Sequence, residues 1–176
     1  MKAGIPVINL DRAFPDRGAY RLQIKGDNFG MGLAAGAYIG AQLQAKGVSN
    51  PIIGEIPGID SLELTQDRSA GFREALGVYG FKVANRRPAE FTADTGQRAA
   101  TELFQALPKI DALWNHDDDQ GIGVLAAIKN ANRSEFFMVG GAGSKAAIDA
   151  ITADNSVLKA TVTYSPSMAS SAIDGL

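Results

Sequence analysis

The chain has 176 residues, a formal net charge of -2 and no cysteine, and 45% of its residues are hydrophobic while 20% are charged. This composition is typical of a globular protein with one domain of ordinary size, and it excludes disulfides. No basic stripe indicates a nucleic-acid partner, and no stretch approaches the roughly 20 apolar residues that a membrane span requires. The opening sequence MKAGIPVINL lacks the pattern of a signal peptide.

Apolar runs and helical patterns alternate along the chain. Short runs rich in β-branched and aromatic residues predict strands, and caps, glycines and prolines mark the ends of the helices between them. The expected strands are 6–10, 20–24, 51–56, 81–84, 112–114, 136–139 and 158–164. The expected helices are 29–45, 62–79, one from Thr92 or Asp94 to Leu107, 121–129, 145–151 after Ser144, and a last one opened by Pro166. This alternation predicts an α/β fold, a three-layer sandwich with a mostly parallel sheet.

The helix expected over residues 29–45 carries three glycines, Gly32, Gly36 and Gly40, four residues apart and therefore on one face. Each glycine costs up to about 1 kcal/mol in a helix interior relative to alanine. Three of them in register indicate a close contact with a neighbouring element. We expect this face to pack against the sheet.

The stretch from Asp111 to Asn130 is the first candidate for a site, because a buried strand there ends in a polar elbow of one histidine and three aspartates. Ligands of open parallel sheets bind at the carboxyl ends of strands, which places one corner of a site around Asp117. Acidic residues in a first helical turn also oppose the macrodipole, and we assign that role to Asp119, with Asp118 open to either role.

The sequence contains little support for a catalytic or a metal-dependent function. Three consecutive carboxylates do not converge easily on one ion, so we expect no metal. His116 is the only histidine, and we expect it to be exposed or hydrogen-bonded. We expect Trp114 to be a core residue. The glycine-rich turn expected over residues 140–143 lacks the phosphate-loop pattern. We therefore expect no enzyme, although an α/β enzyme built on the acidic elbow remains an alternative.

Six segments in fixed order carry a resemblance to a known family. They are GIPVINLDR (4–12), GDNFGMGLAAGAYI (26–39), DRSAGFREAL (67–76), AEFTADTGQ (89–97), NHDDDQGIGVLAAI (115–128) and MVGGAGS (138–144). Together they are similar to the periplasmic sugar-binding proteins of ABC importers, the ribose-binding or type I periplasmic-binding group. The same fold forms the effector core of LacI-type regulators, which is the alternative function. That alternative needs an N-terminal helix-turn-helix, which this sequence lacks.

The resemblance implies two α/β lobes joined by a hinge, with a sugar or polyol between them. On that pattern residues 1–25 are a remnant of the first lobe, residues 26–163 form the second lobe, and residues 164–176 are a truncated return crossover. We expect a fragment of a periplasmic or extracellular protein that works with an importer permease and needs no cofactor. The face left by the missing part of the first lobe leads us to expect a homodimer.

The resemblance assigns three ligand-binding residues to the second lobe. Arg68, in the pattern R-x-x-G-F, would bridge neighbouring sugar hydroxyls with its planar fork. The alternative is a solvated arginine or one paired with Asp67 or Glu63. Phe91 would cover an apolar sugar face, unless it is simply core. Asp117 would accept from hydroxyls, at a position where the family often has asparagine.

Three further candidates lie at the ends of the chain. Asp11 and Arg12 match a first-lobe pair that touches the sugar in the family, although a local ion pair is an alternative. Tyr164 stands where the family often has a hinge glutamine, and it would offer a phenol hydroxyl or a stacking face. Ala142 replaces a frequent family aspartate, so the resemblance implies a ligand or geometry that differs from ribose.

Overall fold

Five parallel strands form the main sheet, in the order β4-β3-β5-β6-β7. The strands are β3 (Ile53–Ile56), β4 (Val83–Arg86), β5 (Ala112–Asn115), β6 (Phe137–Ala142) and β7 (Leu158–Thr163). The structure is a computed structural model and describes residues 4–14, 16 and 18–174, so parts of the predicted first-lobe remnant (1–25) and return crossover (164–176) lie outside the described residues. Every expected strand is present within a few residues of its predicted position.

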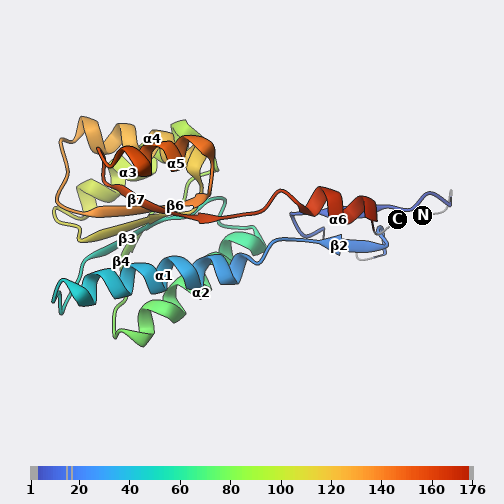
Figure 1. Cartoon of the computed structure of the whole chain (residues 1–176), viewed down its shortest axis with the longest axis horizontal. Coiled ribbons are helices and arrows are strands. Elements are labelled where there is room, and N and C mark those ends of the chain that lie inside the picture. Colours follow the sequence, from blue (N-terminus) through green and yellow to red (C-terminus); the bar gives the residue numbers. More distant parts are fainter. Residues whose placement is uncertain (1–3, 15, 17, 175–176) are drawn as a thin grey trace.

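Helices cover both faces of this sheet (Figure 1). One face carries α1 (Asn28–Ala45) and α2 (Glu63–Val78), and the other carries α3 (Ala93–Ala106), α4 (Asp118–Asn130) and α5 (Lys145–Ala153). The arrangement confirms the predicted three-layer α/β sandwich. No helix of the described part of the chain combines the length and the hydropathy needed to cross a bilayer.

Each face of the sheet has its own apolar core. On the α1–α2 face, the rings of Phe72 and Trp114 lie 4.7 Å apart between centroids, and Trp114 is fully buried. On the opposite face, Leu103 of α3, Val124 of α4 and Met138 of β6 belong to one cluster. The prediction that Trp114 is a core residue is confirmed.

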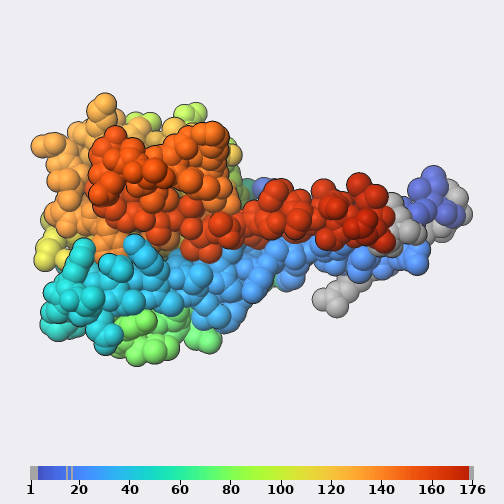
Figure 2. Space-filling view, in the orientation of Figure 1, coloured from blue at the N-terminus to red at the C-terminus, as the bar shows by residue number. Residues whose placement is uncertain are grey.

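The remaining elements form a narrow extension beside this lobe (Figures 1 and 2). Strands β1 (Ile8–Leu10) and β2 (Leu22–Ile24) pair in parallel, and α6 (Met168–Asp174) packs on them. Two segments, residues 25–27 and 164–167, join the extension to the lobe, and we call them the neck. The division of the chain into parts of two lobes stays a prediction.

The glycine face of α1 packs against a helix, so the expectation of a sheet contact is wrong. A Cβ on Gly32 would stand 2.6 Å from the backbone nitrogen of Phe72, and one on Gly36 would stand 2.7 Å from its carbonyl oxygen. Gly40 faces the ring of Tyr79. Both neighbours belong to the C-terminal half of α2, where Tyr79 is the C-cap. The spacing of the glycines indicates which face of α1 makes a close contact, but it does not indicate which element lies against that face.

Two element boundaries differ from the prediction: the start of α4 at the polar elbow and the end of β6. Helix α4 begins at Asp118, three residues earlier than expected, because Asp117 caps it by accepting from the backbone of Gln120. Strand β6 continues through the glycines to Ala142, whose carbonyl accepts from the backbone of Tyr164 at 3.0 Å. The expected turn is therefore strand at Gly140, where a Cβ would contact Asp118 Oδ1 at 2.5 Å.

Candidate functional site

The candidate site lies at the carboxyl ends of β3 and β5, at the edge of the lobe that faces the neck (Figure 1). From β3 the chain proceeds to β4 on one side of the sheet, and from β5 it proceeds to β6 and β7 on the other. Such a switch point leaves a crevice in which open α/β sheets bind ligands. The segment after β3, the elbow after β5 and the loop before α3 all end here.

Arg68 of α2 is the central side chain of this edge. Only 6% of it is exposed, so the solvated alternative is wrong. Its Nε donates to Asn28 Oδ1 at 2.9 Å, and its Nη1 donates to the carbonyl oxygen of His116 at 3.0 Å. Glu63, one of the two carboxylates considered as a partner for Arg68, forms an ion pair with Lys25 at 2.6 Å. Two neutral acceptors therefore fix the guanidinium in place.

Two aromatic rings flank the Arg68 guanidinium. Its Cζ lies 5.0 Å from the centroid of Tyr164 and 5.9 Å from that of Phe91, both within the range of cation–π attraction. Burial lowers the pKa of Arg68, while Tyr164 and the carboxylates of Asp117 and Asp11 oppose that shift. The residue remains a cation, with aromatic faces on two sides. Arg68, Phe91 and Tyr164, chosen separately from the sequence, thus come together.

Phe91 is held in an uncommon backbone conformation. Its φ is 61°, a region that non-glycine residues seldom adopt, and its backbone nitrogen donates to Gln120 Oε1 at 3.0 Å. Its half-buried ring lies directly over Gly58, which follows β3 and has no room for a Cβ. Strain of this kind persists only where the surroundings impose it, and it often marks functional sites.

Asp117 serves as the N-cap of α4, a role that was not predicted for it. Its Oδ1 accepts from the backbone nitrogen of Gln120 at 3.0 Å. Burial raises the pKa of Asp117, the hydrogen bond from Gln120 lowers it, and the charge of Asp119 raises it. Asp119 is exposed in the first turn of α4, as expected. Asp117 is half-buried, on the elbow that also presents the His116 carbonyl to Arg68.

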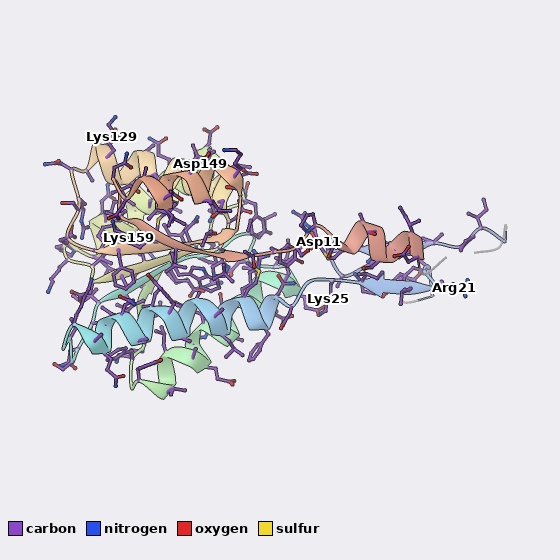
Figure 3. The ribbon with its side chains drawn as sticks, in the orientation of Figure 1. Asp11, Arg21, Lys25, Lys129, Asp149 and Lys159 are labelled. Carbon is purple, nitrogen blue, oxygen red and sulfur yellow. The ribbon has the colours of Figure 1, made fainter. Side chains whose placement is uncertain are left out.

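Tyr164 and Asp11 meet at the neck. The phenol hydroxyl donates to Asp11 Oδ1 at 2.7 Å and accepts from the backbone nitrogen of Gly26 at 3.2 Å. Burial and the contact with Asp11 raise the pKa of Tyr164, so the hydroxyl keeps its proton. Figure 3 labels Asp11 at the junction of lobe and extension. The single phenol proton is therefore engaged by Asp11, and a ligand role for Tyr164, through its hydroxyl or its ring face, stays a prediction.

No described contact joins the Arg12 side chain to Tyr164 and Asp11. The residue is exposed, and its backbone carbonyl accepts from Asn9 Nδ2 at 2.9 Å. Its neighbour Asp11 has a φ of 65° and donates its backbone nitrogen to the carbonyl of Ile24. The two members of the predicted pair therefore differ, because only Asp11 reaches the edge of the site.

Three buried polar residues support the site; Asn28 and Gln120 are not singled out from the sequence, and Asp118 is open there between a ligand role and a helix-start role. Asn28 holds Arg68, as described above. Asp118 accepts from the backbones of Gly141 and Ser144 and from the hydroxyl of Thr161, which ties the elbow to β6 and β7. Gln120 binds the Phe91 backbone and donates to Asn115 and to the carbonyl of Ile56. Their common signal is a polar residue one to five positions after a buried strand or at a helix start.

Beneath Arg68 lies a buried ionic cluster. Glu55 and His116 are both fully buried, and His116 Nε2 lies 3.0 Å from Glu55 Oε1, which also accepts from Ser69 at 2.5 Å. Arg86 Nε lies 3.4 Å from the other carboxylate oxygen. Burial would raise the pKa of Glu55, but His116, Ser69 and Arg86 prevail and lower it. Burial lowers the pKa of His116, so a neutral imidazole donates to a carboxylate.

This cluster agrees with the expectation that His116 is either exposed or hydrogen-bonded. Its Nε2 has a partner, while its Nδ1 has none within the described part of the chain. Over the same residues, no group of three or more histidine and acidic side chains is arranged to hold a metal ion.

The fold and the site define a class of protein: an open α/β lobe whose polar switch-point edge faces a neck of two chain segments. A family model described as a periplasmic binding protein domain matches residues 1–174, and the chain belongs to that family. A ribose import binding protein of Escherichia coli (strain K12) is 32% identical over 139 residues, which are 79% of this chain and 45% of that protein. A D-apiose import binding protein of Actinobacillus succinogenes is 30% identical over 166 residues, which are 90% of this chain and 50% of that protein.

Solved structures show the same similarity. A galactofuranose binding protein superposes with a TM-score of 0.85 at 25% identity, covering 98% of this chain and 60% of that one. The periplasmic binding protein of an arabinose ABC transporter from Shewanella sp. ANA-3, bound to L-arabinofuranose, superposes with a TM-score of 0.81 at 27% identity, covering 98% and 58%. The chain spans about half the length of the curated relatives that it matches.

Proposed function

We propose that this chain supplies one wall of a sugar- or polyol-binding cleft in the substrate-binding protein of an ABC importer. The observation that carries the proposal is the Arg68 guanidinium, which is buried, held by two neutral acceptors and flanked by Phe91 and Tyr164 at the switch point. The import and sugar-binding names of the relatives support the same assignment.

The chemistry of these side chains suits a neutral, hydroxylated ligand. Arginine offers a planar fork of donors to vicinal hydroxyls, an aromatic face covers C–H groups with a large contact area, and a carboxylate accepts from hydroxyls. Arg68, Phe91 and Asp117 would supply these three functions. The relatives are described as binding proteins, which supports a role in binding without bond chemistry.

The wider roles follow from the family and are also proposals. Residues 26–163 would form one lobe, and the neck would act as the hinge about which a second lobe closes on the ligand. The parent protein would be periplasmic or extracellular and would deliver its ligand to a permease. A ligand in the furanose form is supported by two structural relatives, one described as a galactofuranose binding protein and one bound to L-arabinofuranose.

A thermal-shift and calorimetric titration tests the ligand proposal. D-ribose, L-arabinose and D-galactose should raise the melting temperature or release heat in a saturable manner for at least one sugar, because a ligand of the folded state stabilises it by mass action. Arg68→Ala should abolish the response, whereas Arg73→Ala, an exposed arginine of the same helix, should retain it. A response that Arg68→Ala leaves intact would place the ligand elsewhere, and no response to any sugar would remove the proposal.

Self-association is a second, separate proposal. The extension exposes several apolar side chains, which are Ile5, Val7, Leu10, Phe14, Leu22 and Ile173. A two-stranded sheet with such a surface is prone to pair with another copy. Light scattering at rising protein concentration should show a dimer, and a double variant Ile5→Ser/Val7→Ser should shift it toward monomer. A monomeric mass at every concentration would contradict this expectation.

A further inference from the structure

A continuous chain of hydrogen bonds runs from the extension, through both segments of the neck, to Arg68. Tyr164 donates to Asp11 and accepts from the Gly26 backbone nitrogen, at 2.7 and 3.2 Å. The carbonyl oxygen of Gly26 accepts from Asn28 Nδ2 at 3.2 Å, and Asn28 Oδ1 accepts from Arg68 Nε at 2.9 Å. Four bonds thus link residue 11 to residue 68 through residues 164, 26 and 28.

The geometry along this chain is tight. A Cβ on Gly26 would overlap the Tyr164 ring, coming within 2.7 Å of its hydroxyl oxygen, so the phenol rests directly on the neck backbone. Asn28 is only 2% exposed. A primary amide is both donor and acceptor, so asparagine can join a carbonyl oxygen on one side to a guanidinium on the other. Neither a carboxylate nor an apolar side chain can make both bonds.

Arg68 is therefore held at two points of different origin. The His116 carbonyl that receives Nη1 belongs to the lobe itself, at the end of β5. The Asn28 amide accepts from Arg68 Nε through its oxygen and donates to the Gly26 carbonyl through its nitrogen. Its position therefore depends on the position of the neck. The nearby ion pair of Lys25 and Glu63 is half-exposed, and such pairs contribute little. The hydrogen-bond chain, whose bond between Asn28 and Arg68 is buried, is the stronger mechanical link between neck and site.

We propose that Asn28 and Tyr164 are positioning residues for Arg68, which couple the orientation of its guanidinium to the conformation of the neck. Neither residue needs to touch the ligand for this role. The proposal rests on the proposed function only in calling Arg68 the ligand-binding arginine. The coupling itself is a property of the free protein and can be measured without any sugar.

The first experiment follows hydrogen exchange of the Arg68 Nε–H group by NMR in the ligand-free chain. Tyr164→Phe removes the phenol oxygen of the chain and keeps the ring that lies beside the Arg68 guanidinium. It should accelerate exchange of the Arg68 proton several-fold, and Asn28→Ala should accelerate it by about tenfold, as expected for one lost hydrogen bond. The control is Tyr79→Phe, which removes a phenol that bonds the Ala37 carbonyl at 3.3 Å on the outer helix pair. Equal exchange in Tyr164→Phe and Tyr79→Phe would overturn the proposal.

The conservative variant Asn28→Asp separates positioning from general stabilisation. A carboxylate keeps an acceptor for Arg68 Nε but cannot donate to Gly26. Arg68 protection should therefore survive in Asn28→Asp, while the sensitivity to Tyr164→Phe should vanish in that background, which is a non-additive double-mutant cycle. Independent, additive effects of the two changes would show that the residues merely contribute to folding and would refute the coupling.

Ligand titration then distinguishes the two proposals. If the wild-type chain binds a sugar, Tyr164→Phe should weaken binding by about threefold to tenfold without lowering the melting temperature more than Tyr79→Phe does. If no sugar binds while the exchange coupling is observed, the proposed function fails and the positioning of Arg68 stands. Binding of a sugar with no exchange coupling would leave the function and remove the positioning role.

Discussion

The contact between α1 and α2 provides the sharpest test of how this lobe is held together, through the substitution Gly32→Ala. A Cβ at this position would stand 2.6 Å from the Phe72 backbone nitrogen and still closer to the carbonyl oxygen of Arg68. Both obstacles are backbone atoms, so no side-chain rotation relieves them. The two helices would have to move apart locally by several tenths of an ångström or more.

The net effect follows from two opposed contributions. Overpacking of a well-packed interface costs about 1–3 kcal/mol and sometimes more, and a backbone obstacle belongs at the upper end. Replacing glycine in a helix interior with alanine returns up to about 1 kcal/mol. Gly32→Ala should therefore lower the free energy of unfolding by about 2 kcal/mol. Because α2 carries Arg68, the same displacement should also weaken the sugar binding that we propose for this chain.

Gly77→Ala is the matched control, since this glycine also lies in helix α2 and nothing stands within 4 Å of its added Cβ. Only the helix-propensity effect remains, so this variant should gain about 0.5–1 kcal/mol. Urea unfolding of both variants, followed by circular dichroism, gives the two free energies on one scale. If Gly32→Ala is as stable as Gly77→Ala, the close approach of the helices and the reasoning built on it are wrong.

Three further substitutions test single features of the structure. Burial lowers the pKa of His116 from 6.5, so below that pH the unfolded chain binds a proton that the folded chain lacks. The free energy of unfolding should therefore fall as the pH drops below about 6.5, and His116→Gln should flatten this dependence in urea titrations, whereas an unchanged slope would place the titration elsewhere. Asp118→Asn should cost about 1–3 kcal/mol because it places an amide against backbone donors, while exposed Asp119→Asn should stay within about 0.5 kcal/mol in the same assay. Ala142, with a φ of 115°, is strained, and Ala142→Gly should raise the melting temperature through relief of about 1 kcal/mol; a lower melting temperature would show that the strain is absent.

The sequence predicts the architecture well because α/β alternation is a local signal. The run 136–139, for example, is buried and consists of apolar residues alone, which is the pattern of a strand covered on both sheet faces. The boundaries that failed depend on partners distant in sequence. Strand β6 extends to Ala142 because Tyr164 continues the pairing with it, and no local pattern around residues 140–143 reveals that partner.

The same distinction applies to the candidate site. Arg68, Phe91 and Tyr164 are found from residue type and resemblance, and the structure brings them together. Asn28, 40 residues from Arg68, is not found in this way. Its side chain could equally have capped α1, and Asp27 takes that role instead. Which of two adjacent polar residues caps a helix and which turns inward is decided by tertiary contacts.

The choice of partners for Arg68 bears on what the site can bind. Both hydrogen bonds described for its side chain go to neutral oxygens, those of the Asn28 amide and the His116 backbone. A carboxylate in either place would hold the guanidinium equally well but would also neutralise it at close range, leaving weaker donors for a ligand. The carboxylate beneath the site, Glu55, is instead paired with His116 and Arg86. The fold thus keeps its buried anion satisfied by other groups, and it leaves Arg68 as a fixed cation whose N–H groups would suit the hydroxyl oxygens of the proposed ligand.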